Sequence, residues 1–187
     1  MQHAMHGTEP PSDWVRRWAP LISAGSTVLD VACGAGRHLR WLHGLGHSVV
    51  GVDQSATALA ANEGLGEMVC ADIENGPWPL EGRQFGAVVV TNYLWRPLWP
   101  TLVASLAPGG LLIYETFAHG NETVGRPSRA AFLLQPGELL QAFSTLRVVA
   151  YEDGFVPRPD RFVQRIVAVR ELAQAPPPPR YDLGAPI

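Results

Sequence analysis

Short β-rich runs alternate with segments of helical period along most of this chain. The runs are rich in Val, Ile and aromatic residues, whereas the segments between them space their apolar residues three and four apart. This alternation is typical of an α/β fold, in which helices cover both faces of a mostly parallel sheet. The pattern predicts strands over residues 27–33, 48–53, 67–72, 85–92, 111–117, 146–152 and 162–169, and helices over residues 12–18, 37–45, 55–63, 96–106 and 137–143.

A chain of 187 residues without an internal repeat or a Gly/Ser linker is expected to form one domain. We expect that domain to cover residues 11–172. Residues 1–10 are polar and are expected to be flexible, and the tail over 173–187 contains four consecutive prolines, which join neither a helix nor a sheet. The last two strands are joined by a loop containing Pro and Gly, which favours an antiparallel hairpin at the sheet edge.

The composition excludes several classes of protein. With 47% hydrophobic residues the chain is not disordered, and a net charge of -3 provides no basic field for non-specific binding of nucleic acid. Its apolar runs are shorter than the roughly 20 residues needed to span a bilayer, and the N-terminus does not resemble a signal peptide. We therefore expect a soluble, cytoplasmic protein without a membrane partner, in which Cys33 and Cys70 are buried, reduced thiols. No metal site is expected, since Gly44 and Gly46 break the helix between His43 and His47.

A glycine turn follows the first predicted strand. The sequence Asp30-Val-Ala-Cys-Gly34-Ala-Gly36 lies where a buried strand ends and a helix begins. Glycines there allow a ligand to approach the backbone, and the helix that follows offers free N–H groups. A dinucleotide fingerprint requires a third glycine at position 39, which is Leu39 here. At this point a tight turn without a ligand remains an alternative.

Acidic residues at the next two strand ends extend the pattern. Asp53 ends the second strand, seventeen residues after Gly36, where a carboxylate can accept hydrogen bonds from both hydroxyls of a ribose. Asp72 closes the third strand, and the Asp72-Ile73 pair offers a carboxylate to an adenine amino group and an apolar side chain to its ring. Each acid alone could be a helix cap or a solvated strand end. Together, the three strand ends predict a nucleoside site.

These segments resemble the motifs of the class I S-adenosylmethionine-dependent methyltransferases. The similarity runs through VLDVACGAGRH, VVGVDQSATAL, ADIE, FGAVVVTNYL and LAPGGLLIYETF, and spans most of residues 27–117. It implies a Rossmann-like, doubly wound sheet of seven strands in the order 3-2-1-4-5-7-6, with the last strand antiparallel, and S-adenosylmethionine as the cofactor. A general similarity to tellurite-resistance-like and small-molecule bacterial branches suggests a small acceptor.

The resemblance also implies roles for individual residues. The first turn would face the methionine part of the cofactor, the second strand end its ribose, and the third its adenine. The predicted cofactor-binding residues are Asp30, Ala32, Cys33, Gly34, Gly36, Asp53, Gln54, Asp72, Ile73 and Asn92.

Catalytic candidates follow the fourth strand, because ligands meet the carboxyl edge of such a sheet. They are Asn92, Tyr93 and Arg96. The Asn-Tyr-Leu-Trp sequence shares only its first residue type with the Asn-Pro-Pro-Tyr motif of amino-group methyltransferases, which argues against methylation of adenine in DNA or of glutamine side chains by that geometry. Aromatic packing for Tyr93 and Trp95, and a surface position for Arg96, remain alternatives.

The stretch from 118 to 136 has no sustained period and is our candidate lid, because a connection of that length is usually functional. The substrate candidates in and before it are Glu115, His119 and Arg126. Glu115 lies two residues from the end of its strand, where it could point into the pocket or stabilise Arg96.

The sequence therefore predicts transfer of a methyl group from S-adenosylmethionine to a small molecule. An enzyme of the same fold acting on RNA or protein is a second possibility, although the chain has neither a basic patch nor an accessory domain. A third is a sensor module that binds the cofactor or another nucleotide without turnover. The chain is expected to be a monomer or a homodimer, and no dedicated base need be used, since the cofactor carries an activated methyl group.

Overall fold

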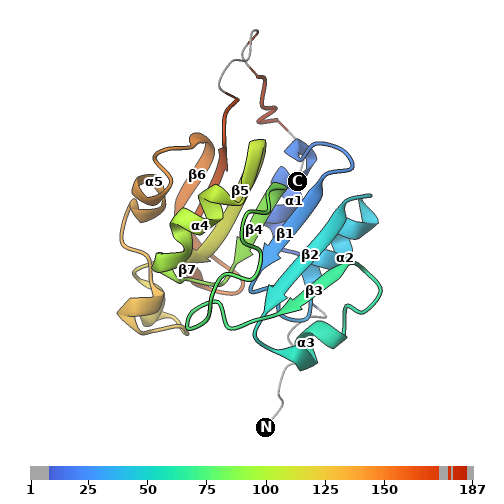
Figure 1. The fold of residues 1–187 in the computed structure, drawn as a ribbon. Helices are drawn as coiled ribbons and strands as arrows, with labels where there is room; N and C mark the ends of the chain where they lie inside the picture. Colours follow the sequence, from blue (N-terminus) through green and yellow to red (C-terminus); the bar gives the residue numbers. More distant parts are fainter. Residues whose placement is uncertain (1–8, 173–176, 178, 185–187) are drawn as a thin grey trace.

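A computed structural model describes residues 9–172, 177 and 179–184, and its centre is a seven-stranded sheet in the order β3-β2-β1-β4-β5-β7-β6 (Figure 1). All neighbouring strands from β3 to β5 are parallel, whereas β7 is antiparallel to both β5 and β6. The predicted strand order and the antiparallel last strand are confirmed. The strands are β1 Thr27–Val31, β2 Ser48–Asp53, β3 Glu67–Cys70, β4 Phe85–Thr91, β5 Leu106–Phe117, β6 Arg147–Val156 and β7 Arg161–Val169.

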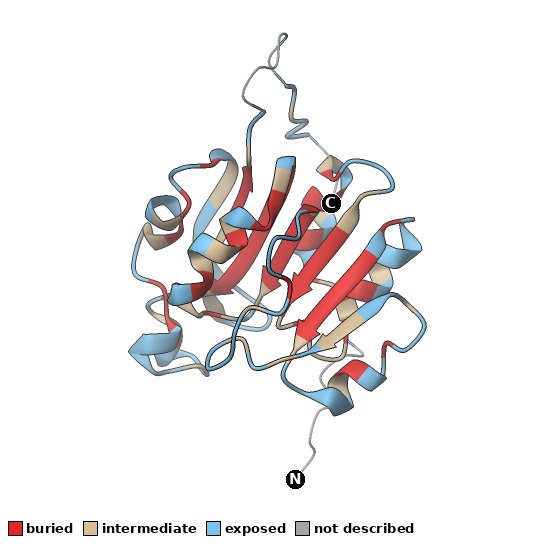
Figure 2. Ribbon diagram, in the orientation of Figure 1, coloured by how far each residue is buried: buried red, intermediate tan, exposed pale blue. Residues whose placement is uncertain are grey.

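Helices cover both faces of the sheet and divide the core into two clusters. Residues of α1, α2 and α3 pack on one face, and residues of α4 and α5 pack on the other. The central strands between these layers are buried along most of their length (Figure 2). The helices are α1 Asp13–Trp18, α2 Arg37–Gly44, α3 Ala56–Ala60, α4 Trp99–Ala104 and α5 Glu138–Ala142, with short 3-10 turns at Ala19–Leu21, Arg96–Leu98, Asn121–Thr123 and Ala130–Phe132.

Two serines begin helices at the predicted places. The hydroxyl of Ser12 accepts the N–H of Trp14 at 3.1 Å, and that of Ser55 accepts the N–H of Ala58 at 3.2 Å. Each bond satisfies an N–H that has no partner within its helix. The helix over 55–63 is shorter than predicted and ends at Ala60. Asn62 is fully buried, and its side chain packs against the glycine turn rather than continuing the helix.

The segment before β5 also differs from the prediction. The α-helix starts at Trp99 instead of Arg96, because Pro100 lacks an N–H and fits only in the first turn of a helix. β5 begins at Leu106 rather than Leu111, since Leu106 pairs with Phe85 and the register then shifts at Pro108-Gly109-Gly110.

The edges and ends of the described chain add four observations. Cys33 is buried as predicted, but the prediction for Cys70 is wrong, because β3 is an edge strand and leaves this thiol exposed. Glu9 forms an ion pair with Arg37 at 3.2 Å, whereas residues 1–8 lie outside the described residues. Much of the predicted tail is likewise outside them, although Tyr181 packs beside Arg147. No helix in the described part of the chain is both long and apolar enough to cross a membrane.

Candidate functional site

The turn between β1 and α2 is closed on one side and open on the other. Ala32, Gly34 and Gly36 have φ values of 54°, 53° and 75°, a region that favours glycine. A Cβ at Gly36 would lie 2.1 Å from Oδ1 of Asn62, so the backbone passes too close for a side chain. A Cβ at Gly34 would meet no atom within 4 Å. The turn is therefore packed at Gly36 and leaves free space at Gly34.

Asp53, at the end of β2, contacts this turn directly. Its Oδ2 accepts the N–H of Gly34 at 2.8 Å, and its Oδ1 accepts the N–H of Ser55 at 2.9 Å. Each carboxylate oxygen can accept more than one hydrogen bond. Asp53 thus holds the turn in place and keeps lone pairs for a ligand.

Asp72 lies after β3 and organises the loop that follows. Its Oδ1 accepts the backbone N–H groups of Glu74 and Asn75 at 3.0 and 3.1 Å, and its Oδ2 accepts Nδ2 of Asn75 at 3.0 Å. The hydrogen bond from the Asn75 side chain is the main cause that lowers the pKa of Asp72. Asp72 is therefore an ionised hydrogen-bond acceptor at neutral pH.

A first cavity, here called the β2–β3 cavity, brings these strand ends together. Its volume is about 100 Å³. Five predicted cofactor residues line it, although they are up to 41 positions apart in the sequence, together with the predicted catalytic residue Tyr93. The lining residues with acidic or amide groups are Asp53, Gln54, Asp72 and Glu74, and the others are Ala32, Ala71, Ile73 and Tyr93.

A second cavity, here called the β4–β5 cavity, adjoins the first. Its volume is about 300 Å³. Glu74 and Tyr93 line both cavities, so the two cavities meet at these residues. The remaining lining residues are Asn92 and Leu94 after β4, Thr116 and Phe117 at the end of β5, and Pro127 and Phe132 in the loop that follows.

Sequence reasoning missed Glu74 as a site residue. It stands two positions after Asp72 in the ADIE segment, and only the turn that Asp72 caps brings it to both cavities. Phe132 lies fifteen residues beyond the end of β5, and no sequence pattern predicts that it lines the β4–β5 cavity.

Tyr93 and Asn92 are fixed by their backbone. Asn92 has a φ of 54°, and its N–H donates to the carbonyl of Glu115 at 2.9 Å. The hydroxyl of Tyr114 donates to the carbonyl of Tyr93 at 2.9 Å. Burial, followed by the nearby Glu74 carboxylate, raises the pKa of Tyr93. The phenol is therefore neutral at physiological pH.

Asp30 and Cys33 lie beneath the turn rather than in the cavities. Asp30 is 1% exposed, and burial raises its pKa to about 8. Its Oδ2 lies 3.8 Å from Nδ1 of His38, whose Nε2 accepts the N–H of Ser12 at 3.1 Å. His38 is buried, and burial lowers its pKa to about 3. The Cys33 side chain packs in the core near Leu39. Asp30 and Cys33, which the sequence predicts to bind the cofactor, therefore lie beneath the turn and support it.

Arg96 binds the loop after β5 instead of facing a cavity. Its guanidinium donates to both carboxylate oxygens of Glu138 at 2.6 and 2.9 Å and to the carbonyls of Ala131 and Leu133 at 2.9 and 3.0 Å. These four hydrogen bonds connect the 3-10 turn before α4 to the candidate lid and to the start of α5.

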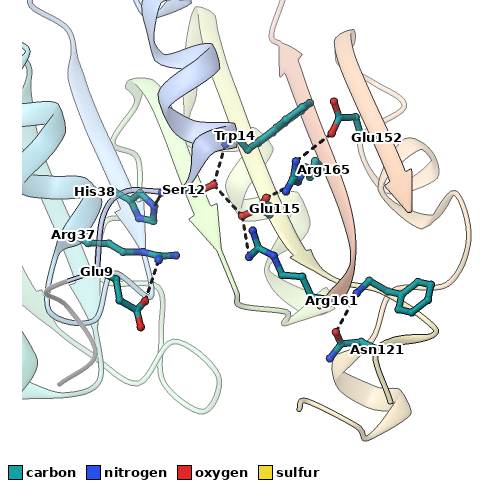
Figure 3. Close-up of polar contacts among 11 residues, drawn as sticks. Glu9, Ser12, Trp14, Arg37, His38, Glu115, Asn121, Glu152, Arg161 and Arg165 are labelled. Atoms are coloured by element: carbon teal, nitrogen blue, oxygen red, sulfur yellow. Dashed lines mark hydrogen bonds and ion pairs between the residues drawn. The ribbon is translucent and has the colours of Figure 1, made fainter. Parts of the chain in front are cut away.

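The predicted orientation of Glu115 is wrong (Figure 3). Its side chain is fully buried on the face of the sheet that α1 covers, where Ser12 Oγ donates to it at 2.9 Å and Arg165 forms an ion pair with it. Successive side chains of a strand point to opposite faces, so Thr116 faces the β4–β5 cavity and Glu115 does not. Glu115 also makes no contact with Arg96, which pairs with Glu138.

The candidate lid is an ordered loop whose ends meet. The N–H of Leu134 donates to the carbonyl of Phe117 at 3.0 Å, and the N–H of His119 donates to the carbonyl of Leu134 at 2.8 Å. Asn121 is buried and fixes the loop to β7 through the N–H of Phe162 at 3.2 Å (Figure 3). The predicted substrate residues His119 and Arg126 are exposed and line neither cavity, because Pro127 and Phe132 supply the inward-facing side chains.

Two larger cavities, of about 530 and 550 Å³, lie away from the glycine turn. The second is lined by Thr27, Ser48 and Glu67, which begin β1, β2 and β3 and so mark the amino edge of the sheet. In a parallel sheet of this kind ligands bind at the carboxyl edge, where the two smaller cavities lie.

Comparisons with known proteins agree with this geometry. Residues 28–110 match the family model described as a methyltransferase domain. The structure of TehB from Haemophilus influenzae superimposes with a TM-score of 0.69 at 20% identity, over 85% of this chain and 62% of that one. Residues 28–110 therefore match a methyltransferase domain, and the strand order is that of the Rossmann-like methyltransferase fold. This match and this fold imply S-adenosylmethionine as the cofactor.

Other proteins that this chain resembles differ in what their names say they act on. The tRNA U34 carboxymethyltransferase of Klebsiella pneumoniae subsp. pneumoniae is 34% identical over 125 residues, which cover 58% of this chain and 37% of that protein. A probable thiopurine S-methyltransferase of Yarrowia lipolytica is 49% identical over 45 residues, 24% of this chain and 21% of its own length. The N-methyltransferase NodS of Bradyrhizobium japonicum has a TM-score of 0.64 at 15% identity, covering 84% and 93% of the two chains. The chain thus spans well under half the length of these two curated relatives.

Proposed function

We propose that the protein transfers a methyl group from S-adenosylmethionine, held at the glycine turn and the β2–β3 cavity, to a small molecule held in the β4–β5 cavity. The observation that carries this proposal is the meeting of the two cavities at Glu74 and Tyr93. Methyl transfer requires the two reactants to be adjacent and aligned, and two adjoining cavities at the carboxyl edge of the sheet meet that requirement.

The residues present fit the cofactor. Asp53 and Asp72 are hydrogen-bond acceptors suited to ribose hydroxyls and to an adenine amino group, and Ile73 offers an apolar surface for the ring. The space beside Gly34 leaves room for a ligand against the backbone. Bound there, the cofactor supplies an activated methyl group on a sulfonium.

The chain's own residues then have positioning tasks. Tyr93 and Asn92 follow β4 with a fixed backbone and border the second cavity, so they can orient the acceptor. Pro127 and Phe132 of the lid border that cavity, where they limit the access of water to a bound acceptor. Arg96 holds the lid through the carbonyls of Ala131 and Leu133. This division of tasks assigns Tyr93 and Asn92 to the acceptor and gives Arg96 a positioning role.

A small acceptor is favoured over RNA by the size and lining of the second cavity. Its volume of about 300 Å³ lies at the lower end of the range for small-molecule sites. None of the described residues that line it is Lys or Arg, whereas RNA binding depends on basic groups that contact phosphates. The names of the relatives include both a tRNA and a thiopurine enzyme, so the proposal of a small acceptor is supported by the lining of the cavity and not by these names.

Calorimetric titration tests the cofactor, with S-adenosylmethionine, its demethylated product S-adenosylhomocysteine, and NAD as ligands. We expect micromolar binding of the first two and none of NAD. Absence of binding of the first two would overturn the proposal. Incubation with labelled cofactor and either a small-molecule extract or total RNA then tests the acceptor. Label entering RNA alone would contradict the small acceptor, and binding without formation of S-adenosylhomocysteine would favour a sensor.

A further inference from the structure

We propose that the acceptor is an organic amine carried on a ring or other apolar group, and that the Glu74 carboxylate recognises its nitrogen. This inference rests on the proposed function and deepens it, because it names the class of molecule that the β4–β5 cavity binds. It is carried by the charge of that cavity, by its aromatic walls and by the place of Glu74 at the boundary of the two cavities.

The charge of the cavity comes from one side chain. Of the described residues that line it, Glu74 is the only charged one. Arg96, in the 3-10 turn before α4, has its guanidinium paired with Glu138. Arg126 and Arg129 in the lid are exposed and lie outside the lining. An unopposed carboxylate attracts an ammonium group and repels a carboxylate or phosphate, so a cationic or hydrogen-donating nitrogen is favoured over an anionic acceptor.

The walls of the cavity are mostly apolar and aromatic. Tyr93, Phe117 and Phe132 contribute rings, and Leu94 adds an aliphatic surface. Aromatic faces attract cations near their centres, and they also pack well against rings of the ligand. Together with the carboxylate, these rings fit a molecule that has an amine at one end and an apolar body at the other.

Glu74 lies next to the place that the acceptor nitrogen has to occupy for methyl transfer. It lines both cavities, and its N–H donates to Asp72 Oδ1 at 3.0 Å, so its backbone is fixed by a residue proposed to bind adenine. An amine held by the Glu74 carboxylate would therefore lie at the border of the cofactor cavity. The phenol of Tyr93 borders the same space.

Methyl transfer to this amine requires no reactant other than the cofactor. The bound ammonium would first give one proton to the Glu74 carboxylate, which would pass it to solvent, and this frees the nitrogen lone pair. That lone pair would then form the N–C bond while the S–C bond of the sulfonium breaks with its electron pair returning to sulfur, so the positive charge passes from sulfur to the methylated nitrogen. Glu74 thus has two tasks, since it selects the amine and holds its proton.

The experiment compares three ligands of similar shape and different charge, namely benzylamine, benzyl alcohol and benzoate. Their binding to the protein saturated with S-adenosylhomocysteine is measured by ligand-observed NMR titration, with no turnover required. We expect benzylamine to bind at least tenfold tighter than benzoate and tighter than benzyl alcohol. In Glu74→Gln the preference for benzylamine should disappear. In Glu81→Gln, which removes the same charge from an exposed side chain outside both cavities, it should persist.

The outcomes separate this inference from the proposed function. Benzoate or benzyl alcohol binding as tightly as benzylamine to the wild-type protein would overturn the inference, whatever the variants do. An amine preference that survives in Glu74→Gln would overturn the role of Glu74. Loss of S-adenosylhomocysteine binding by the wild-type protein would instead refute the proposed function. Retained binding of S-adenosylhomocysteine by Glu74→Gln shows that this variant is folded.

Discussion

Asp53 accepts a hydrogen bond from the backbone N–H of Gly34 at 2.8 Å, and this contact joins the carboxyl end of β2 to the turn after β1. The same side chain also accepts the N–H of Ser55, which caps α3. One carboxylate therefore connects two strand ends and a helix start while bordering the β2–β3 cavity. The local structure and the proposed ribose site depend on the same group.

Replacing Asp53 with Ala should weaken binding of S-adenosylmethionine by about thirtyfold, roughly 2 kcal/mol, because a carboxylate that accepts two ribose hydrogen bonds is lost. Stability should fall by about 1 kcal/mol as well, since the N–H groups of Gly34 and Ser55 lose their partner. Calorimetric titration and urea unfolding measure the two effects. Asp160→Ala, in the exposed turn between β6 and β7, is the control. Unchanged affinity in Asp53→Ala would refute the ribose assignment.

Gly36→Ala should destabilise the protein more than Gly25→Ala. Both glycines have positive φ, 75° and 69°, so both variants incur a backbone strain of roughly 1 kcal/mol. Only at Gly36 would the added Cβ meet Asn62, at 2.1 Å, whereas at Gly25 it meets nothing within 4 Å. The difference between the two variants in urea unfolding therefore isolates the close contact with Asn62. Equal losses of unfolding free energy in the two variants would show that Asn62 moves aside without cost.

Most of the fold could be predicted because its signals are local. Strands β1, β2 and β4 consist mostly of apolar residues, and such runs mark strands that are buried on both faces. The sequence predicts a helix over 96–106, which begins three residues before α4. The spacing of apolar residues does not show that Pro100, which lacks an N–H, has to lie in the first turn of the helix.

The lining of the β2–β3 cavity was predictable for a related reason. Asp53 ends β2 and Asp72 follows β3, and the carboxyl ends of parallel strands meet at one edge of the sheet. The lining of the β4–β5 cavity was not predictable, because it depends on how a loop folds back. Phe132 reaches the cavity only because the ends of the lid pair with each other. Glu115 was misplaced because its face of the strand is set by the register of β5 with β7, which pairs it with Arg165.

Arg96→Met should destabilise the protein by about 2 to 3 kcal/mol, because Glu138 keeps a largely buried carboxylate without its partner and two carbonyls lose a donor. The control is Arg83→Met. It breaks an ion pair with Glu67 whose side chains are 41% and 49% exposed, and an exposed pair contributes at most about 1 kcal/mol. Thermal unfolding compares the two variants. If Arg96→Met kept its stability but lost turnover, Arg96 would act on the acceptor, as the sequence predicted.

The protonation of Asp30 and His38 should make stability depend on pH in two opposite ways. Burial raises the pKa of Asp30 from 3.8 to about 8, so between these values the folded state binds more protons than the unfolded state and stability falls as pH rises. Burial lowers the pKa of His38 from 6.5 to about 3, so between these values the folded state binds fewer protons and stability rises with pH. The two effects oppose each other between pH 4 and 6.5, and Asp30 acts alone above that range.

Between pH 6.5 and 8 the wild-type protein should therefore lose stability, with a slope of at most about 1.4 kcal/mol per pH unit. Asp30→Asn removes the titrating group and should flatten this part of the profile, while the rise below pH 6.5 from His38 becomes visible. Urea unfolding at half-unit steps of pH gives both profiles, and the exposed Asp160→Asn variant, on the turn between β6 and β7, should follow the wild type. If the wild-type protein and Asp30→Asn kept the same slope above pH 6.5, Asp30 would be ionised beneath the glycine turn. His38 would then have to balance that buried charge across the 3.8 Å between Nδ1 and Oδ2.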